Sequence, residues 1–189
     1  MATRGRKVRS RFWKSPGLYA SSCTSPARSW VQKIAGSTTK QRLASAPVIG
    51  GGKLFVMDTN GTVHAFDAGT GAQVWSQSFQ IKGDGQSSVY GGGASFADGR
   101  LYVTTGMGEV AALDAGDGKQ VWKVKPAGPL RGSPTIAFNS VYVMTQDNRI
   151  HALNADDGKP LWNESGSTGQ AGVFGVAAPA AGQGTVIAG

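Results

Sequence analysis

The chain has 189 residues, of which 29 are Gly, whereas only 16% are charged and 40% are hydrophobic. This composition excludes a coiled coil, which needs many charged residues, and a collagen, which needs a strict glycine period. No apolar run approaches the ~20 residues of a membrane-spanning helix. Abundant glycine with aromatic and β-branched residues instead favours many short strands joined by tight turns.

The net charge of +8 is distributed unevenly. Residues 1–57 contain 11 of the 19 Lys and Arg residues and no acid, whereas residues 58–189 carry a net charge of −3. A basic terminal stretch with Ser, Pro and Gly is typical of disordered chain. We therefore predict that residues 1–29 are a disordered basic segment without a recognisable fold, and we expect no nucleic-acid partner.

The basic start also invites comparison with a targeting signal. A secretory signal needs about 7–15 consecutive apolar residues after its charged region. Only the short run Pro16–Ala20 follows the basic residues here, so we expect no functional signal peptide in this chain. Cys23 follows small residues, as a lipid-modified cysteine would, but without the apolar segment its lipidation stays open. As the single Cys it forms no internal disulfide.

Three segments of the chain, residues 54–75, 101–122 and 141–162, align without gaps. They share an aromatic residue, an alanine, an Asp or Asn, a glycine and a tryptophan at fixed distances. These residues are Phe55, Tyr102 and Tyr142; Ala65, Ala112 and Ala152; Asp67, Asp114 and Asn154; Gly71, Gly118 and Gly158; Trp75, Trp122 and Trp162. The tryptophans are 47 and 40 residues apart, a spacing typical of the four-stranded blades of a β-propeller.

Each copy predicts four strands in the same order. The first two strands of the copies are expected at residues 47–49 and 54–57, 94–96 and 101–105, and 134–136 and 141–145. A hairpin turn follows, and in the first copy it is Asn60-Gly61, the strongest short hairpin signal. The third strand carries the shared alanine, and the fourth is expected to end at the tryptophan. The predicted fold is all-β, a β-propeller fragment of antiparallel blades within residues 30–189.

Both ends of the repeat region are incomplete. Trp30 lies 45 residues before Trp75, as expected for the last strand of a preceding blade. Ala178-Pro179 matches the start of a blade, and residues 185–187 match the start of its second strand. We thus expect one terminal strand, three whole blades and about half of another unit, in a piece of a longer protein. Two open sheet edges favour aggregation, so we expect the isolated chain to fold poorly.

The shared residues have structural explanations. The Asp or Asn opens the last turn of each copy, where a short side chain can accept hydrogen bonds from nearby backbone N–H groups. The glycine four residues before each tryptophan permits a positive φ angle. The alanine suits a close approach of neighbouring sheets. The tryptophans are expected to pack between adjacent blades and to use their indole N–H groups.

No catalytic or metal site is predicted. Residues 114–118 partly match a calcium loop, but no distal Glu completes it. Residues 91–93 and 106–108 are glycine-rich, but no helix follows either, as a phosphate loop requires. His64 and His151 occupy the same repeat position on separate blades, so a shared metal is not expected. No Ser-His-Asp or Cys-His arrangement stands out.

The ending Ala-x-Asp-Ala-x-x-Gly-x-x-x-Trp resembles the propeller repeat of pyrroloquinoline-quinone (PQQ) enzymes and their relatives. Within that superfamily, about residues 30–189 resemble the BamB family of outer-membrane-protein assembly factors. Four stretches carry this resemblance: residues 41–47, 91–93, 102–106 and 129–134.

The resemblance implies a non-catalytic scaffold without a cofactor. Members are eight-bladed periplasmic lipoproteins at the inner face of the outer membrane, which bind the POTRA repeats of the barrel-assembly protein BamA. Unfolded outer-membrane proteins are further possible partners. The family carries a Leu-Arg-Gly segment in one binding loop, and Leu130, Arg131 and Gly132 match it. A leucine can fill a partner's pocket, and an arginine offers a planar charged donor.

Two features of the family are not matched. Residues 174–176 stand where an acidic pair is expected, and residues 1–29 lack the lipidation signal. Two other functions also stay open. A PQQ-dependent dehydrogenase has a similar repeat, but it needs a longer chain, a calcium site and usually adjacent cysteines. The other is a sensor or ligand-binding propeller of a larger protein.

Overall fold

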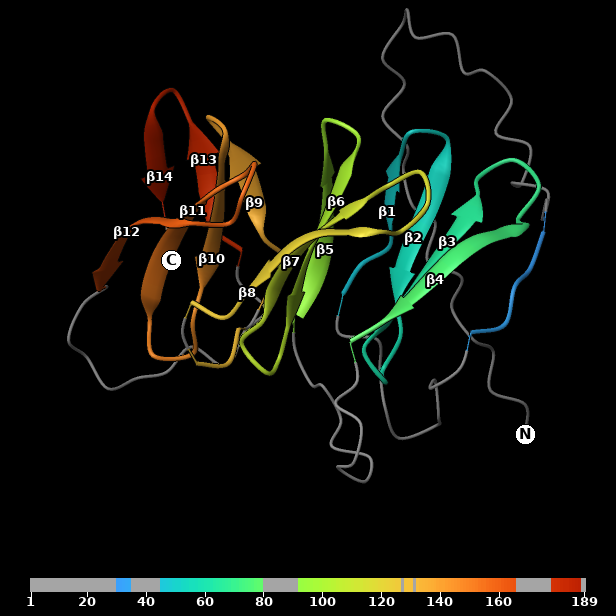
Figure 1. Ribbon diagram of the computed structural model, residues 1–189, viewed down its shortest axis with the longest axis horizontal. Helices are drawn as coiled ribbons and strands as arrows, with labels where there is room; N and C mark the ends of the chain where they lie inside the picture. Colours follow the sequence, from blue (N-terminus) through green and yellow to red (C-terminus); the bar gives the residue numbers. More distant parts are fainter. Residues whose placement is uncertain are drawn as a thin grey trace, which may run out of the picture.

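The computed structural model describes residues 30–34, 45–79, 92–126, 128–130, 132–165 and 178–187. Within these ranges all regular structure is β. Three four-stranded antiparallel sheets lie side by side in chain order, and a two-stranded hairpin follows them (Figure 1). The prediction of an all-β propeller fragment with three complete blades is confirmed. In the described part of the chain, no helix could cross a membrane.

The strands follow one another in space as they do in the sequence. Blade 1 contains β1 (Val48–Gly50), β2 (Lys53–Met57), β3 (Thr62–Asp67) and β4 (Gln73–Ser78). Blade 2 contains β5 (Gly92–Ala97), β6 (Arg100–Thr105), β7 (Val110–Asp114) and β8 (Gln120–Val124). Blade 3 contains β9 (Thr135–Ala137), β10 (Ser140–Met144), β11 (Arg149–Asn154) and β12 (Pro160–Ser165). The final hairpin consists of β13 (Ala180–Gly182) and β14 (Thr185–Ile187).

The predicted strand positions need two corrections. The fourth strand of each blade does not end at the tryptophan but continues two or three residues beyond it. In blade 1 the pairing runs past Ala65 and Trp75 to Thr62 and Ser78, so the indole lies in mid-strand. In blade 2 the first strand begins at Gly92, two residues early, because Gly92 pairs with Thr105.

Each sheet has two faces that take different parts in packing. Phe55 pairs with Ala65, and Ala65 pairs with Trp75, so these three side chains share one face. We call this the forward face of a blade and the opposite one its rear face. The forward face of blade 1 packs against the rear face of blade 2, which presents Leu101 and Val103, in one buried cluster. A second cluster repeats this arrangement between blades 2 and 3.

The described ends of the chain lie against the outer blades. Trp30 packs on the rear face of blade 1, where its ring centroid is 6.3 Å from that of Phe66. At the other end, the Thr135 hydroxyl donates to the Pro179 carbonyl, which holds the last hairpin beside β9. The predicted disorder of residues 1–29 lies outside the described residues, and the boundary at residue 30 stays a prediction.

Candidate functional site

The Asp or Asn at the start of the last turn in each blade accepts backbone hydrogen bonds within that turn. In blade 1, Asp67 Oδ1 accepts hydrogen bonds from the backbone N–H groups of Gly69 at 3.1 Å and Thr70 at 2.8 Å. The bond from the Thr70 N–H is the main reason why the pKa of Asp67 is lowered. Equivalent bonds close the other turns, from Gly116 to Asp114 at 2.7 Å and from Asp156 to Asn154 at 2.8 Å.

Each of these turns forms a socket for the tryptophan of the preceding blade. Trp75 Nε1 donates to the carbonyl oxygen of Ala115 at 3.1 Å. The indole ring covers Gly118 so closely that a Cβ there would lie 2.7 Å from it. Gly118 also has a φ angle of +76°. Both the backbone conformation and the ring contact therefore require glycine.

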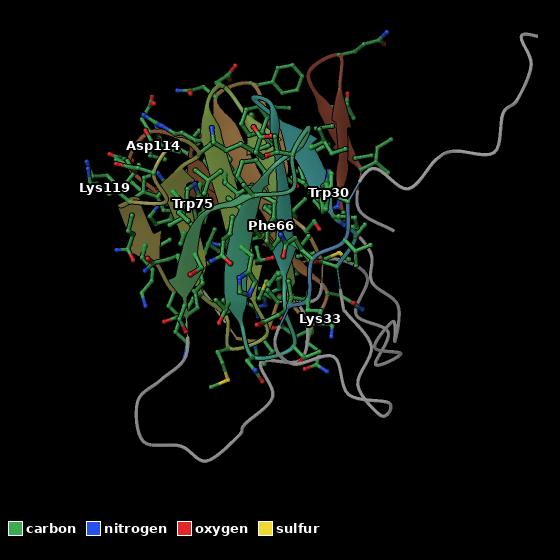
Figure 2. All side chains as sticks on the ribbon, turned by 90° about the vertical axis from the view of Figure 1, so that its right-hand side faces the viewer. Trp30, Lys33, Phe66, Trp75, Asp114 and Lys119 are labelled. Atoms are coloured by element: carbon green, nitrogen blue, oxygen red, sulfur yellow. The ribbon has the colours of Figure 1, made fainter. Side chains whose placement is uncertain are left out.

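The same socket recurs at the other two junctions. Trp122 donates to Ala155 at 2.9 Å and its ring covers Gly158. Trp30 donates to Ala68 at 3.1 Å and covers Gly71, although residues 30–34 form no strand. Figure 2 shows Trp75 on the side of the blade 2 turn residues Asp114 and Lys119, and Trp30 on the other side of Phe66. The tryptophans thus connect successive blades in one direction.

Trp162 differs from the other tryptophans. It is 41% exposed, whereas Trp75 and Trp122 are 9% and 7% exposed. Its ring contacts Tyr142 of its own blade at a centroid distance of 5.9 Å, but no socket receives it within the described ranges. All six residues of β12 are exposed.

The two histidines lie in separate environments. His64 Nε2 is 3.2 Å from the buried carboxylate of Asp58. His151 is 9% exposed, and its Nε2 atom has no hydrogen-bond partner in the part of the chain that is described. Among the same residues, no three His, Cys, Asp or Glu side chains are grouped so that they could hold a metal ion.

The buried imidazole of His151 predicts a pH effect on stability. Burial lowers its pKa from the ordinary value of 6.5, and the attraction of Asp147 opposes this only in part. As the pH falls through that value, the unfolded chain binds a proton that the folded chain excludes, so stability decreases. We expect a lower urea midpoint at about pH 5.5 than at about pH 7.5.

The variant His151→Gln checks the source of this effect. We expect it to lose a measurable part of the difference in urea midpoint between the two pH values, because glutamine does not titrate. The lowered carboxyl pKa values of Asp67 and Asp147 act only at more acidic pH and do not enter this comparison. An unchanged difference in the variant would show that His151 is not responsible.

The loop that enters blade 3 contains the predicted partner-binding residues. Leu130 is 2% exposed, belongs to the cluster between blades 2 and 3, and forms an isolated β-bridge with Thr145. The carbonyl oxygen of the preceding residue, Pro129, accepts a hydrogen bond from the Gln146 N–H at 2.9 Å. The Leu130 side chain thus packs inside the described structure, and its contact with a partner stays a prediction. Arg131 lies outside the described residues.

Gly132 is fixed by the side chain of Thr104, which is not among the predicted site residues. The hydroxyl of the fully buried Thr104 donates to the Gly132 carbonyl at 2.7 Å and accepts from the Gly93 N–H at 3.0 Å. A Cβ on Gly93 would lie 2.1 Å from Ser133 Oγ, so strand β5 and the loop approach each other closely. The signal available in the sequence was a pair of threonines, Thr104 and Thr105, at the end of a predicted strand.

A cavity of about 280 Å³ lies between blades 2 and 3, beside the β9–β10 turn. Its wall includes Arg100, Phe138 and Asn139. Arg100 already donates to the Ala155 carbonyl at 3.0 Å and to Asp156 at 3.1 Å. At the corresponding place between blades 1 and 2, the ring of Phe96 lies against Gly50. The cavity therefore reflects the smaller Ile136 at the position of Phe96 in blade 3. The side chains of Arg100, Asn139 and Asp156 in its wall already have hydrogen-bond partners within the protein.

The blades and sockets define a β-propeller with PQQ-like repeats. The family model described as outer membrane protein assembly factor BamB matches residues 11–88 and 59–189. The chain belongs to this BamB family. No curated protein gave a match.

Several solved structures share the fold. BamB from Moraxella catarrhalis is 24% identical, with 77% of this chain and 46% of that chain covered and a TM-score of 0.60. Quinohemoprotein alcohol dehydrogenase from Comamonas testosteroni is 27% identical over 66% of this chain and 21% of its own, with a TM-score of 0.56. The computationally designed Ika4 protein is 15% identical, with 85% of this chain and 92% of the Ika4 chain covered and a TM-score of 0.63. The chain spans less than half of the BamB chain.

Proposed function

We propose that this chain is a non-catalytic scaffold component of the machinery that assembles β-barrels in the outer membrane. The match of the BamB family model along nearly the whole chain carries this proposal. Its partners would be the POTRA repeats of BamA, and it would act at the periplasmic face of the outer membrane. Contact with unfolded outer-membrane proteins is a further part of the proposed role.

The binding element that we assign is the loop at residues 129–132. Leu130 is held by burial and by its bridge to Thr145, and Gly132 is held by the Thr104 hydroxyl. In the sequence, Arg131 lies between these two residues. Fixing residues of a binding loop in advance lowers the entropy lost on binding. An arginine there can bind a carboxylate of the partner with two parallel hydrogen bonds.

Reversing the charge of Arg131 tests this assignment. We expect Arg131→Glu to weaken binding to the BamA POTRA repeats at least tenfold, with the melting temperature unchanged. Lys125→Glu is the matched control, because this exposed residue undergoes the same change of charge before the loop begins. Unchanged binding of Arg131→Glu would contradict the assigned site. Equal loss in both variants would also contradict it, because general charge would then explain the effect.

A PQQ-dependent dehydrogenase is the second candidate, supported by the 27% identity to the Comamonas enzyme. Such an enzyme binds PQQ with calcium. Among the described residues, no three His, Cys, Asp or Glu side chains are grouped so that they could hold a metal ion. Adding PQQ and calcium should leave the melting temperature of the chain unchanged, and a clear increase would favour the enzyme.

A further inference from the structure

The cavity of about 280 Å³ lies between two complete blades, at the edge opposite to the loop at residues 129–132. The turns β5–β6 and β9–β10 lie together at that edge (Figure 1). Strand β10 begins at the second turn and ends at Met144, next to the bridge between Leu130 and Thr145. A partner bound at the cavity would leave the loop free, so this site is independent of the proposed function.

The turn β9–β10 holds a phenylalanine in a backbone conformation that bulky residues avoid. Phe138 has a φ angle of +52°, in the left-handed region. The corresponding turns of the other units carry Gly51, Asp98 and Gln183 at this position, each followed by a glycine. Phe138 is also 56% exposed, so burial of its ring does not compensate for the strain. Strained residues of this kind gather at ligand sites.

The charged side chains that line the cavity are the carboxylates of Asp98 and Asp156 and the guanidinium of Arg100. Arg100 donates to Asp156 at 3.1 Å, and Asn139 donates to the second oxygen of that carboxylate at 3.0 Å. Asp98 is exposed, and its carboxylate makes no hydrogen bond or ion pair with another described residue. Two negative charges and one positive charge leave a net charge of −1, and the carboxylate of Asp98 is available to a cation.

An arginine side chain matches this lining. Its aliphatic part would contact Ala97 and Ile136, which form apolar walls of the cavity. Its planar guanidinium can stack on the exposed ring of Phe138 and donate two parallel hydrogen bonds to Asp98. The ammonium group of a lysine cannot make these two planar contacts. We propose that the cavity is a docking site for an arginine side chain of a partner protein.

The junction between blades 1 and 2 shows how this space can be closed. There the ring of Phe96 covers Gly50 so closely that a Cβ on Gly50 would lie 2.2 Å from it. Ile136 and Ala97 occupy these two positions between blades 2 and 3. The double variant Ala97→Gly/Ile136→Phe therefore copies the closed junction. We expect it to fill the cavity from within and to keep the blades folded.

Nuclear magnetic resonance of the isotope-labelled full chain tests the proposal, with Nα-acetyl-arginine amide as the probe. We expect saturable shifts of the backbone amide signals of Asp98 and Phe138, with a Kd of about 1 mM for this single side chain. Nα-acetyl-citrulline amide has nearly the same shape without the charge and should bind about fivefold more weakly. Absence of saturable shifts, or equal binding of the two probes, would overturn the proposal.

The variant Asp98→Asn removes the charge without disturbing the turn, because asparagine tolerates the φ angle of +49° at this position. We expect it to bind the arginine probe about fivefold more weakly, with the melting temperature unchanged. Asp117→Asn is the matched control, because it removes an exposed carboxylate from another turn of blade 2 and should bind as the wild type does. Equal losses in both variants would contradict the site, since general charge would then explain them.

The variant Phe138→Gly separates a binding role from a structural one. Glycine stands at this position in blade 1 and relieves the strained backbone, so we expect a higher melting temperature together with weaker binding of the arginine probe. The filled variant Ala97→Gly/Ile136→Phe should also lose binding, while its far-UV spectrum stays that of the wild type. Binding at wild-type strength in either variant would show that the probe binds elsewhere and would contradict the proposal.

Discussion

Replacing Gly118 by alanine should destabilise the chain by about 2–5 kcal/mol. The φ angle of +76° places an L-residue in the left-handed region, which costs about 1–2 kcal/mol. The new Cβ would also lie 2.7 Å from the ring of the buried Trp75. Because both the turn backbone and the indole are fixed, the tryptophan would have to leave its socket, which adds an overpacking cost of about 1–3 kcal/mol.

Gly99 provides a matched control for this prediction. Its φ angle is +75°, but no atom lies within 4 Å of the position of a Cβ. Gly99→Ala should therefore cost only the conformational part, about 1–2 kcal/mol. Urea denaturation of both variants measures the free energy of unfolding, and the difference reports the socket contact. Equal destabilisation would show that the tryptophan–glycine contact contributes nothing.

Removing the indole itself should have the second large effect. Trp75→Ala deletes a side chain that is 9% exposed and belongs to the cluster between blades 1 and 2, so we expect a loss of about 3–5 kcal/mol. Trp75→Phe retains an aromatic ring but leaves the buried Ala115 carbonyl without the donor it has in the described structure. An unsatisfied buried carbonyl costs about 1–3 kcal/mol.

The equivalent substitution in blade 2 separates the hydrogen bond from the packing. Ala155 accepts from Trp122, but it also accepts from Arg100 at 3.0 Å. Trp122→Phe should therefore destabilise the chain less than Trp75→Phe, because the Ala155 carbonyl keeps a charged donor. The urea midpoints of the two phenylalanine variants give the comparison. A larger loss for Trp122→Phe would rule out the hydrogen-bond explanation.

The blades were predictable from the sequence because the repeat places the same residues at fixed distances in three copies. The acceptors of the tryptophans were not, since Ala115 is 40 residues from Trp75 and no local pattern encodes contacts between blades. The continuation of the fourth strands was missed because the residues after the tryptophans are polar in blades 1 and 3, and only Lys123 and Val124 continue the strand in blade 2. The anchoring hydroxyl of Thr104 was also missed, because its partner Gly132 lies 28 residues later, in the loop before blade 3.

The role as an assembly scaffold is tested most directly by calorimetric titration of the wild-type chain with the POTRA repeats of BamA from the same organism, alongside a titration with PQQ and calcium. We expect saturable binding of the POTRA repeats and no heat from PQQ. Binding of PQQ without binding of the POTRA repeats would contradict it.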